Sequence, residues 1–163
     1  MGWAGVVLVG AVVTTGLMAG LFAAFSYAVM PGLGQLGDAE FVAAMQRVNV
    51  AILNPVFGVC FGGALVTSVA AAVLHLAPGR RAALPWIVAG AVLYVLVLGI
   101  TMGVSVPLND RLAAAGSTDP AAARDAFEAV WVRWNVVRAV LTTAAFGCLS
   151  WALVLHGRLG SSG

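Results

Sequence analysis

Four stretches of the sequence are long and apolar enough to cross a lipid bilayer, and this feature restricts the fold more than any other. They span about residues 3–30, 55–76, 84–106 and 134–156. A bilayer core of about 30 Å needs about 20 helical residues. Only 9% of the residues are charged, against about 25% in soluble domains. We therefore predict an all-α protein, an integral membrane four-helix bundle that forms a single membrane domain over residues 1–163.

Proline and glycine mark the expected ends of these spans. Pro31-Gly32 is expected to end the first span and Pro107 the third, because proline disfavours helix in the residue before it. The connection at 78–81 is a short turn. The connections at 31–54 and 107–133 are long, hold all six acidic residues, and lie on the same side of the membrane.

Each long connection also contains a signal for an amphipathic, interfacial helix. Asp38 is expected to cap a helix over 38–53, in which apolar residues recur at helical spacing. Asp119-Pro120 is a plausible start for a second helix over 119–134.

Charge and composition exclude several classes of function. The net charge of +2, without a basic run, does not suggest nucleic-acid binding. The apolar N-terminal stretch is too long for a secretory signal, so a retained membrane helix is expected. Arginine density around Arg80, Arg81 and Arg158 favours both termini on the cytoplasmic side. The two cysteines and two histidines form no metal-binding motif.

Polar and aromatic side chains gather at the membrane face that carries the long connections. At about 100° per residue, Trp131, Asn135 and Arg138 share one helix face, with Trp134 adjoining. The other polar candidates at this face are Gln46, Asn49, Asn54, Asn109 and Asp110.

Two interpretations of this group remain open. Tryptophan and arginine are common membrane-interface anchors, and Asn54 and Asn135 are able to cap helices. Alternatively, Arg138 faces the bundle interior, because an arginine near the bilayer centre costs about 2.5–3.5 kcal/mol on insertion scales. Buried amides also need partners. The group would then form a small polar pocket covered by aromatic rings.

The sequence resembles the four-span membrane family that includes the anthrone oxygenases. The resemblance is carried by FAAFSYAVMPGL, AMQRVNVAILNPVF, VPLNDRL and WVRWNVVRAV, in this order over nearly the whole chain. It implies oxidation of an anthrone methylene to an anthraquinone ketone by O2, without a metal, flavin or other cofactor. The matching residues are Gln46, Asn49, Asn54, Pro107, Asn109, Trp131, Trp134, Asn135 and Arg138.

The chemistry suggests roles for the polar and aromatic side chains of this group. Arg138 would stabilise an anion, Asn135, Asn109 and Asn49 would donate hydrogen bonds, and Trp131 and Trp134 would stack on the substrate. Gln46 and Asn54 complete the substrate-binding candidates. Asp110 is the nearest candidate base, unless it is a solvated carboxylate paired with Arg111.

The expected setting is a bacterial inner membrane, with a lipophilic polyketide-like substrate, O2 and lipid as partners and with oligomerisation open. Two alternatives stand beside the oxygenase. One is a non-catalytic membrane protein that binds or exports a hydrophobic metabolite. The other is a haem-bearing membrane subunit ligated by His75 and His156.

Overall fold

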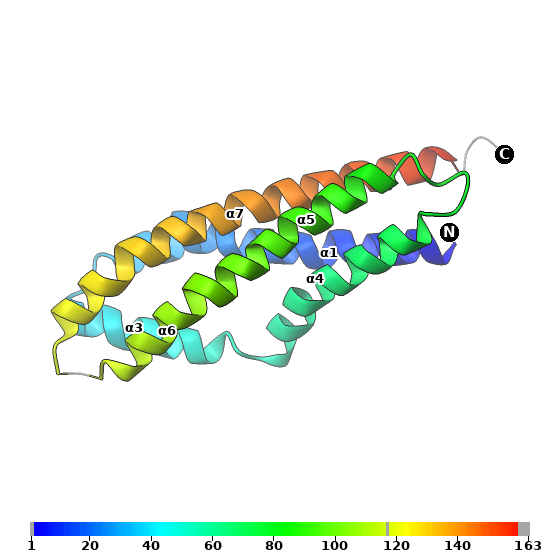
Figure 1. Ribbon diagram of the computed structural model, residues 1–163. Coiled ribbons are helices and arrows are strands. Elements are labelled where there is room, and N and C mark those ends of the chain that lie inside the picture. Colours follow the sequence, from blue (N-terminus) through cyan, green and yellow to red (C-terminus); the bar gives the residue numbers. More distant parts are fainter. Residues whose placement is uncertain (1, 117, 160–163) are drawn as a thin grey trace.

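The computed structural model describes residues 2–116 and 118–159, and every element in these ranges is helical. Figure 1 shows the arrangement. The elements are α1 (Trp3–Ala24), η1 (Phe25–Val29), α2 (Met30–Leu33), α3 (Asp38–Ala51), α4 (Pro55–Leu74), α5 (Leu84–Ile100), η2 (Thr101–Ser105), α6 (Val106–Ala114) and α7 (Pro120–Leu159). The segments labelled η are π-helical turns.

Four continuous helices are long and apolar enough to cross a membrane, as predicted. They are Trp3–Leu33, Pro55–Leu74, Leu84–Ala114 and Pro120–Arg158. Their outward side chains are apolar: Leu17, Val66 and Val92 are each more than half exposed. Such a surface is unfavourable in water and suits lipid. The chain is a multi-pass membrane protein with an all-α bundle.

The two ends of the bundle differ (Figure 1). The start of α1, the α4–α5 turn and the end of α7 lie at one end, where Gly79 takes a φ of +86° in the short turn. The helices α3 and α6 and the start of α7 lie at the other, which we call the polar end. Helix α7 packs against both α1 and α5, and α4 packs mainly against α1. The polar end therefore carries the extra helical structure, as the long connections suggested.

The predicted ends at Pro31 and Pro107 were wrong, because the first and third helices continue past both prolines. In each case the proline is the second residue after a five-residue π-helical turn. A proline in an α-helix lacks an N–H and its ring clashes with the carbonyl four residues earlier. A wider π turn moves that carbonyl, so the helix passes through the proline.

The third connection is also shorter than expected. The helix predicted from Asp119-Pro120 is present, and the Asp119 carboxylate caps it by accepting the Ala122 N–H at 3.1 Å. It is not separate, however, because it runs on into the fourth span as the 40-residue helix α7. No proline or glycine occurs between 121 and 146, so nothing interrupts it.

The helix in the first connection begins differently from the prediction. Asp38 is its first residue and does not cap it; the Gly37 N–H instead donates to the Glu40 carboxylate at 3.3 Å. The Asp38 carboxylate pairs with Arg124 at 3.0 Å.

Arg124 on α7 holds this connection in place. Its guanidinium donates to the carbonyl oxygens of Leu36 and Gly34 at 2.8 and 2.9 Å, as well as to Asp38 and to Glu128. It also lies 4.5 Å from the centre of the Phe41 ring. One side chain thus fixes the start of α3, which forms one wall of the site described below.

Replacing Arg124 with alanine should loosen the 34–38 segment while leaving the spans folded. The backbone carbonyls would lose their charged donor, so amide exchange around α3 should become roughly tenfold faster. Hydrogen exchange with mass spectrometry in detergent measures this. Arg111→Ala, which removes an exposed arginine from α6, is the matched control. Equal exchange in both variants would contradict the role given to Arg124.

Candidate functional site

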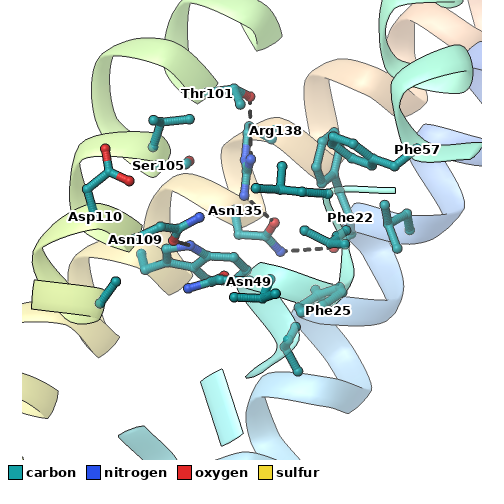
Figure 2. Close-up of a pocket in the computed structure, with 18 of the residues that line it drawn as sticks. Phe22, Phe25, Asn49, Phe57, Thr101, Ser105, Asn109, Asp110, Asn135 and Arg138 are labelled. Carbon is teal, nitrogen blue, oxygen red and sulfur yellow. Dashed lines mark hydrogen bonds between the residues drawn. The ribbon is translucent and has the colours of Figure 1, made fainter. Parts of the chain in front are cut away.

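A cavity of about 290 Å³ opens at the polar end of the bundle. It lies between the end of α1, α3, the start of α4, the η2–α6 segment and α7 (Figure 2). Its walls are mainly apolar, with aromatic rings from Phe22, Phe25, Phe57 and Trp131. Its polar lining residues are Gln46, Asn49, Thr101, Ser105, Asn109, Asp110, Asn135 and Arg138. An apolar cavity with a few convergent polar groups is the usual form of a small-molecule site.

Helix α7 supplies one wall of the cavity. The prediction that Trp131, Asn135 and Arg138 share a helix face is confirmed, because all three are buried and line the cavity. Asn135 is 1% exposed and Arg138 is 4% exposed. They are interior residues of the bundle, so the interface-anchor interpretation does not describe them.

Asn135 orients the arginine. Its amide nitrogen donates to the Phe22 carbonyl oxygen at 2.9 Å and to the Ser26 hydroxyl at 2.8 Å. Its amide oxygen accepts from Nη2 of Arg138 at 2.9 Å. Both N–H donors of the side chain are therefore used within the protein. Asn135 therefore fixes Arg138 against the end of α1. The sequence had suggested instead that Asn135 donates a hydrogen bond to a substrate.

Arg138 carries a buried positive charge with neutral neighbours. Nη1 donates to the Thr101 hydroxyl at 3.4 Å, and the guanidinium lies 4.5 Å from the centre of the Phe22 ring and 5.4 Å from that of Trp131. Within residues 2–116 and 118–159, neither of the two ion pairs involves it. Aromatic faces and neutral oxygens stabilise the guanidinium without cancelling its charge.

Unpartnered buried polar atoms concentrate at this cavity. Over the described part of the chain, four buried side-chain atoms lack a hydrogen-bond partner: Asn49 Nδ2, Ser105 Oγ, Arg138 Nε and Thr15 Oγ1. The first three belong to residues that line the cavity. Because buried polar groups are nearly always hydrogen-bonded, three available donors around one cavity point to a ligand with acceptor atoms.

The other predicted polar residues divide between structure and cavity. Gln46 donates to the Leu112 carbonyl oxygen at 2.9 Å, which joins α3 to α6. Asn109 accepts the Trp131 indole N–H at 3.0 Å, which fixes that ring. Asp110 is exposed, lines the cavity and makes no ion pair within the described residues. The suggested pairing of Asp110 with Arg111 is therefore not formed.

Two predicted substrate-binding residues lie outside the cavity lining. Asn54 is exposed and caps α4, its side-chain oxygen accepting the Phe57 N–H at 3.1 Å. Trp134 is partly buried and follows Trp131 by three residues, which places it about 60° around the helix. Neither is positioned to contact a molecule in the cavity.

Sequence patterns did not identify several lining residues. Phe22, Phe57, Thr101 and Ser105 lie in apolar spans, where nothing distinguishes a cavity-facing side chain from a lipid-facing one. Their positions follow from how the helices rotate against each other. In the sequence, Thr101 and Ser105 stand out only as hydroxyl residues within a hydrophobic run, and such residues are common in membrane helices.

The two histidines form a separate pair at the opposite end of the bundle. His75 Nε2 lies 3.0 Å from His156 Nδ1, and His75 Nδ1 lies 2.7 Å from the Ala71 carbonyl oxygen. Two axial haem ligands would need the iron between their nitrogen atoms, yet these two atoms are in direct hydrogen-bond contact. The geometry does not fit a haem held by this pair.

Comparison with known proteins supplies the family. No curated protein matches the chain, and no solved structure matches it. The model of the family described as anthrone oxygenase matches residues 54–148, more than half of the 163 residues. This region includes Thr101, Ser105, Asn109, Asp110 and the α7 face with Arg138. The chain belongs to the anthrone oxygenase family.

Proposed function

We propose that the cavity binds a lipophilic hydroxyaromatic of the anthrone class as its oxyanion and promotes oxidation of that substrate by O2. The observation that carries this proposal is the buried Arg138, which has no anionic partner among residues 2–116 and 118–159 and shares an apolar cavity with the unpartnered polar atoms of Asn49 and Ser105. An anthrone that has lost a methylene proton places the negative charge on its carbonyl oxygen. That oxygen would accept the hydrogen bonds for which the buried donors at the cavity have no partner.

Charge balance favours the anionic form of the ligand. A buried cation without a counter-ion is costly in a membrane bundle, and an anion bound beside it relieves that cost. The low-dielectric walls strengthen the attraction between the two charges. Because Asn135, Thr101 and the Phe22 ring hold the guanidinium in place, no reorganisation is needed when the oxyanion forms.

The walls suit a flat aromatic of modest size. A volume of about 290 Å³ is close to the lower bound of the range of about 300–1,000 Å³ for ligand pockets. Phe22, Phe25, Phe57 and Trp131 provide faces and edges for ring contacts. A polyketide-derived tricyclic compound would also reach such a site by partitioning into the bilayer.

The proposed reaction converts one methylene and one O2 into one ketone and one water. Asp110, at the cavity edge, takes a methylene proton, and the electron pair left behind spreads to the carbonyl oxygen beside Arg138. This oxyanion transfers one electron to O2. The resulting carbon radical and superoxide then join through a C–O bond to give a peroxide.

The peroxide resolves without an external reductant. Asp110 returns its proton to the outer oxygen. Loss of the second methylene proton then breaks the O–O bond and leaves the ketone and hydroxide, which combines with that proton to give water. The methylene carbon gives up four electrons and O2 accepts four, so the substrate supplies every electron and the reaction needs no cofactor for balance.

Arg138→Met should remove most of the activity while the protein still folds. Methionine keeps apolar volume but provides no charge, and losing one oxyanion-stabilising group typically costs about 100- to 1,000-fold in kcat. Oxygen uptake by purified protein with an anthrone, corrected for spontaneous oxidation, measures the change. Arg133→Ala, an exposed arginine on the same helix, is the control. Activity in Arg138→Met equal to that of the control would contradict the proposal.

The same assay separates the oxygenase from a non-catalytic carrier. A wild-type protein that binds an anthrone tightly but returns it unchanged, with no uptake above the spontaneous rate, would favour binding or export of a hydrophobic metabolite.

Asp110→Asn should slow turnover most at neutral pH. As the amide cannot take the methylene proton, kcat/KM should fall about 100-fold or more. At high pH an anthrone ionises in solution, so the variant should recover part of the rate. The pH dependence of kcat/KM from pH 6 to 10 tests this, with Asp125→Asn as the control. Parallel profiles for the two variants would show that Asp110 is not the base.

A further inference from the structure

The π turn η2 changes which hydrogen bonds are available at the cavity wall. In this turn the N–H of Val106 bonds to the carbonyl of Thr101, five residues earlier. An α-helix would bond residues four apart. Single π turns inside α-helices often occur at functional sites, and this one lies directly beside Arg138 (Figure 2).

Most hydroxyl groups in this bundle are occupied by their own helix. Within the described residues, six serine or threonine hydroxyls donate to the carbonyl four residues earlier: Thr14, Ser26, Thr67, Ser68, Thr101 and Thr142. This bond is the ordinary way for an apolar helix to satisfy a hydroxyl. A buried hydroxyl that does not make it needs another partner.

Ser105 is an exception among the described residues. The carbonyl four residues before it belongs to Thr101 and lies in the π turn, where it accepts the Val106 N–H in place of the Ser105 N–H of a regular α-helix. The Ser105 hydroxyl is buried without a partner, and the residue is 3% exposed. Thr15 also lacks a partner, but it does not line the cavity, whereas Ser105 does.

The π turn also aligns the polar groups of this wall. At about 100° per residue, Thr101 and Asn109 would differ by about 80° around a regular α-helix. The extra residue in the π turn reduces this difference, and Thr101, Ser105 and Asn109 all line the cavity. Thr101 contacts the Arg138 guanidinium. Ser105, four residues later on the same wall, is left free.

We propose that Ser105 is a further catalytic residue, whose hydroxyl donates a hydrogen bond to the substrate oxyanion that Arg138 stabilises. This inference rests on the proposed function and adds a donor to it. A hydroxyl rotates to follow the charge, and its hydrogen bond to an oxyanion is stronger than one to a neutral carbonyl. Ser105 therefore favours the ionised substrate over the neutral one, which accelerates the chemical step.

Two measurements on Ser105→Ala test this role. With an anthrone, kcat should fall about 100-fold while KM changes little. With 2-hydroxyanthraquinone, a product-like probe that has no methylene to oxidise, the absorbance change on ionisation of the bound phenol should move to higher pH. A merely structural serine would not alter the ionisation of a bound ligand.

Two further variants complete the design. Ser105→Thr keeps the hydroxyl and should restore most of both signals, which also covers the case that the alanine variant folds poorly. Ser68→Ala removes another buried hydroxyl, one that bonds within α4 and lies outside the cavity lining. It should behave as wild type, and thermal unfolding in detergent checks that all variants are folded.

The outcomes separate the two proposals. If wild type oxidises an anthrone and binds the probe, but Ser105→Ala matches Ser68→Ala in both measurements, the role of Ser105 is overturned and the proposed function stands. If wild type neither oxidises an anthrone nor binds the probe as its anion, the proposed function fails and the role of Ser105 fails with it.

Discussion

The site is organised around a guanidinium that lies inside a membrane bundle and has no anionic partner among the described residues. Arg138 is held by the side-chain oxygens of Asn135 and Thr101 and by the faces of Phe22 and Trp131. Each of these groups fixes its position, and none neutralises it. A protein needing only a stable helix contact could use an apolar side chain here at lower cost. The unpaired charge is the feature from which we propose a ligand that supplies the opposite charge.

The two π turns make this arrangement possible on either side of α7. Ser26, in η1, accepts a hydrogen bond from Asn135, and Thr101, in η2, accepts one from Arg138. Both turns are followed at the second residue by a proline, Pro31 or Pro107. The wider turn lets each helix pass its proline and changes the direction of nearby polar groups. The irregular turns that follow α1 and α5 thus help to position polar groups of the continuous helix α7.

The sequence predicted the bundle and part of the site for different physical reasons. Bilayer thickness determines the length of the spans, and the 3.6-residue repeat puts Asn135 and Arg138 on one face. The helix ends predicted at Pro31 and Pro107 were wrong because the π turns before these prolines cannot be recognised from the residue pattern. Trp134 was misplaced because neighbouring aromatics on a helix look alike until the partner helices are known. Phe22 and Ser105 could not be found at all, since helix rotation decides which apolar-span residues face inward.

The position of the cavity connects the chemistry to the membrane. Its deep wall carries the fixed charge, while Asp110 and the exposed apolar residues Val50 and Leu53 lie at its edge. A lipophilic aromatic can therefore contact a carboxylate and an apolar surface before it reaches Arg138. In the proposed reaction, proton removal at the edge and charge stabilisation in the interior would be separated in space, so that a base and a cation would act on one substrate without neutralising each other. A direct ion pair between Asp110 and Arg138 would satisfy both groups and leave neither available for the reaction.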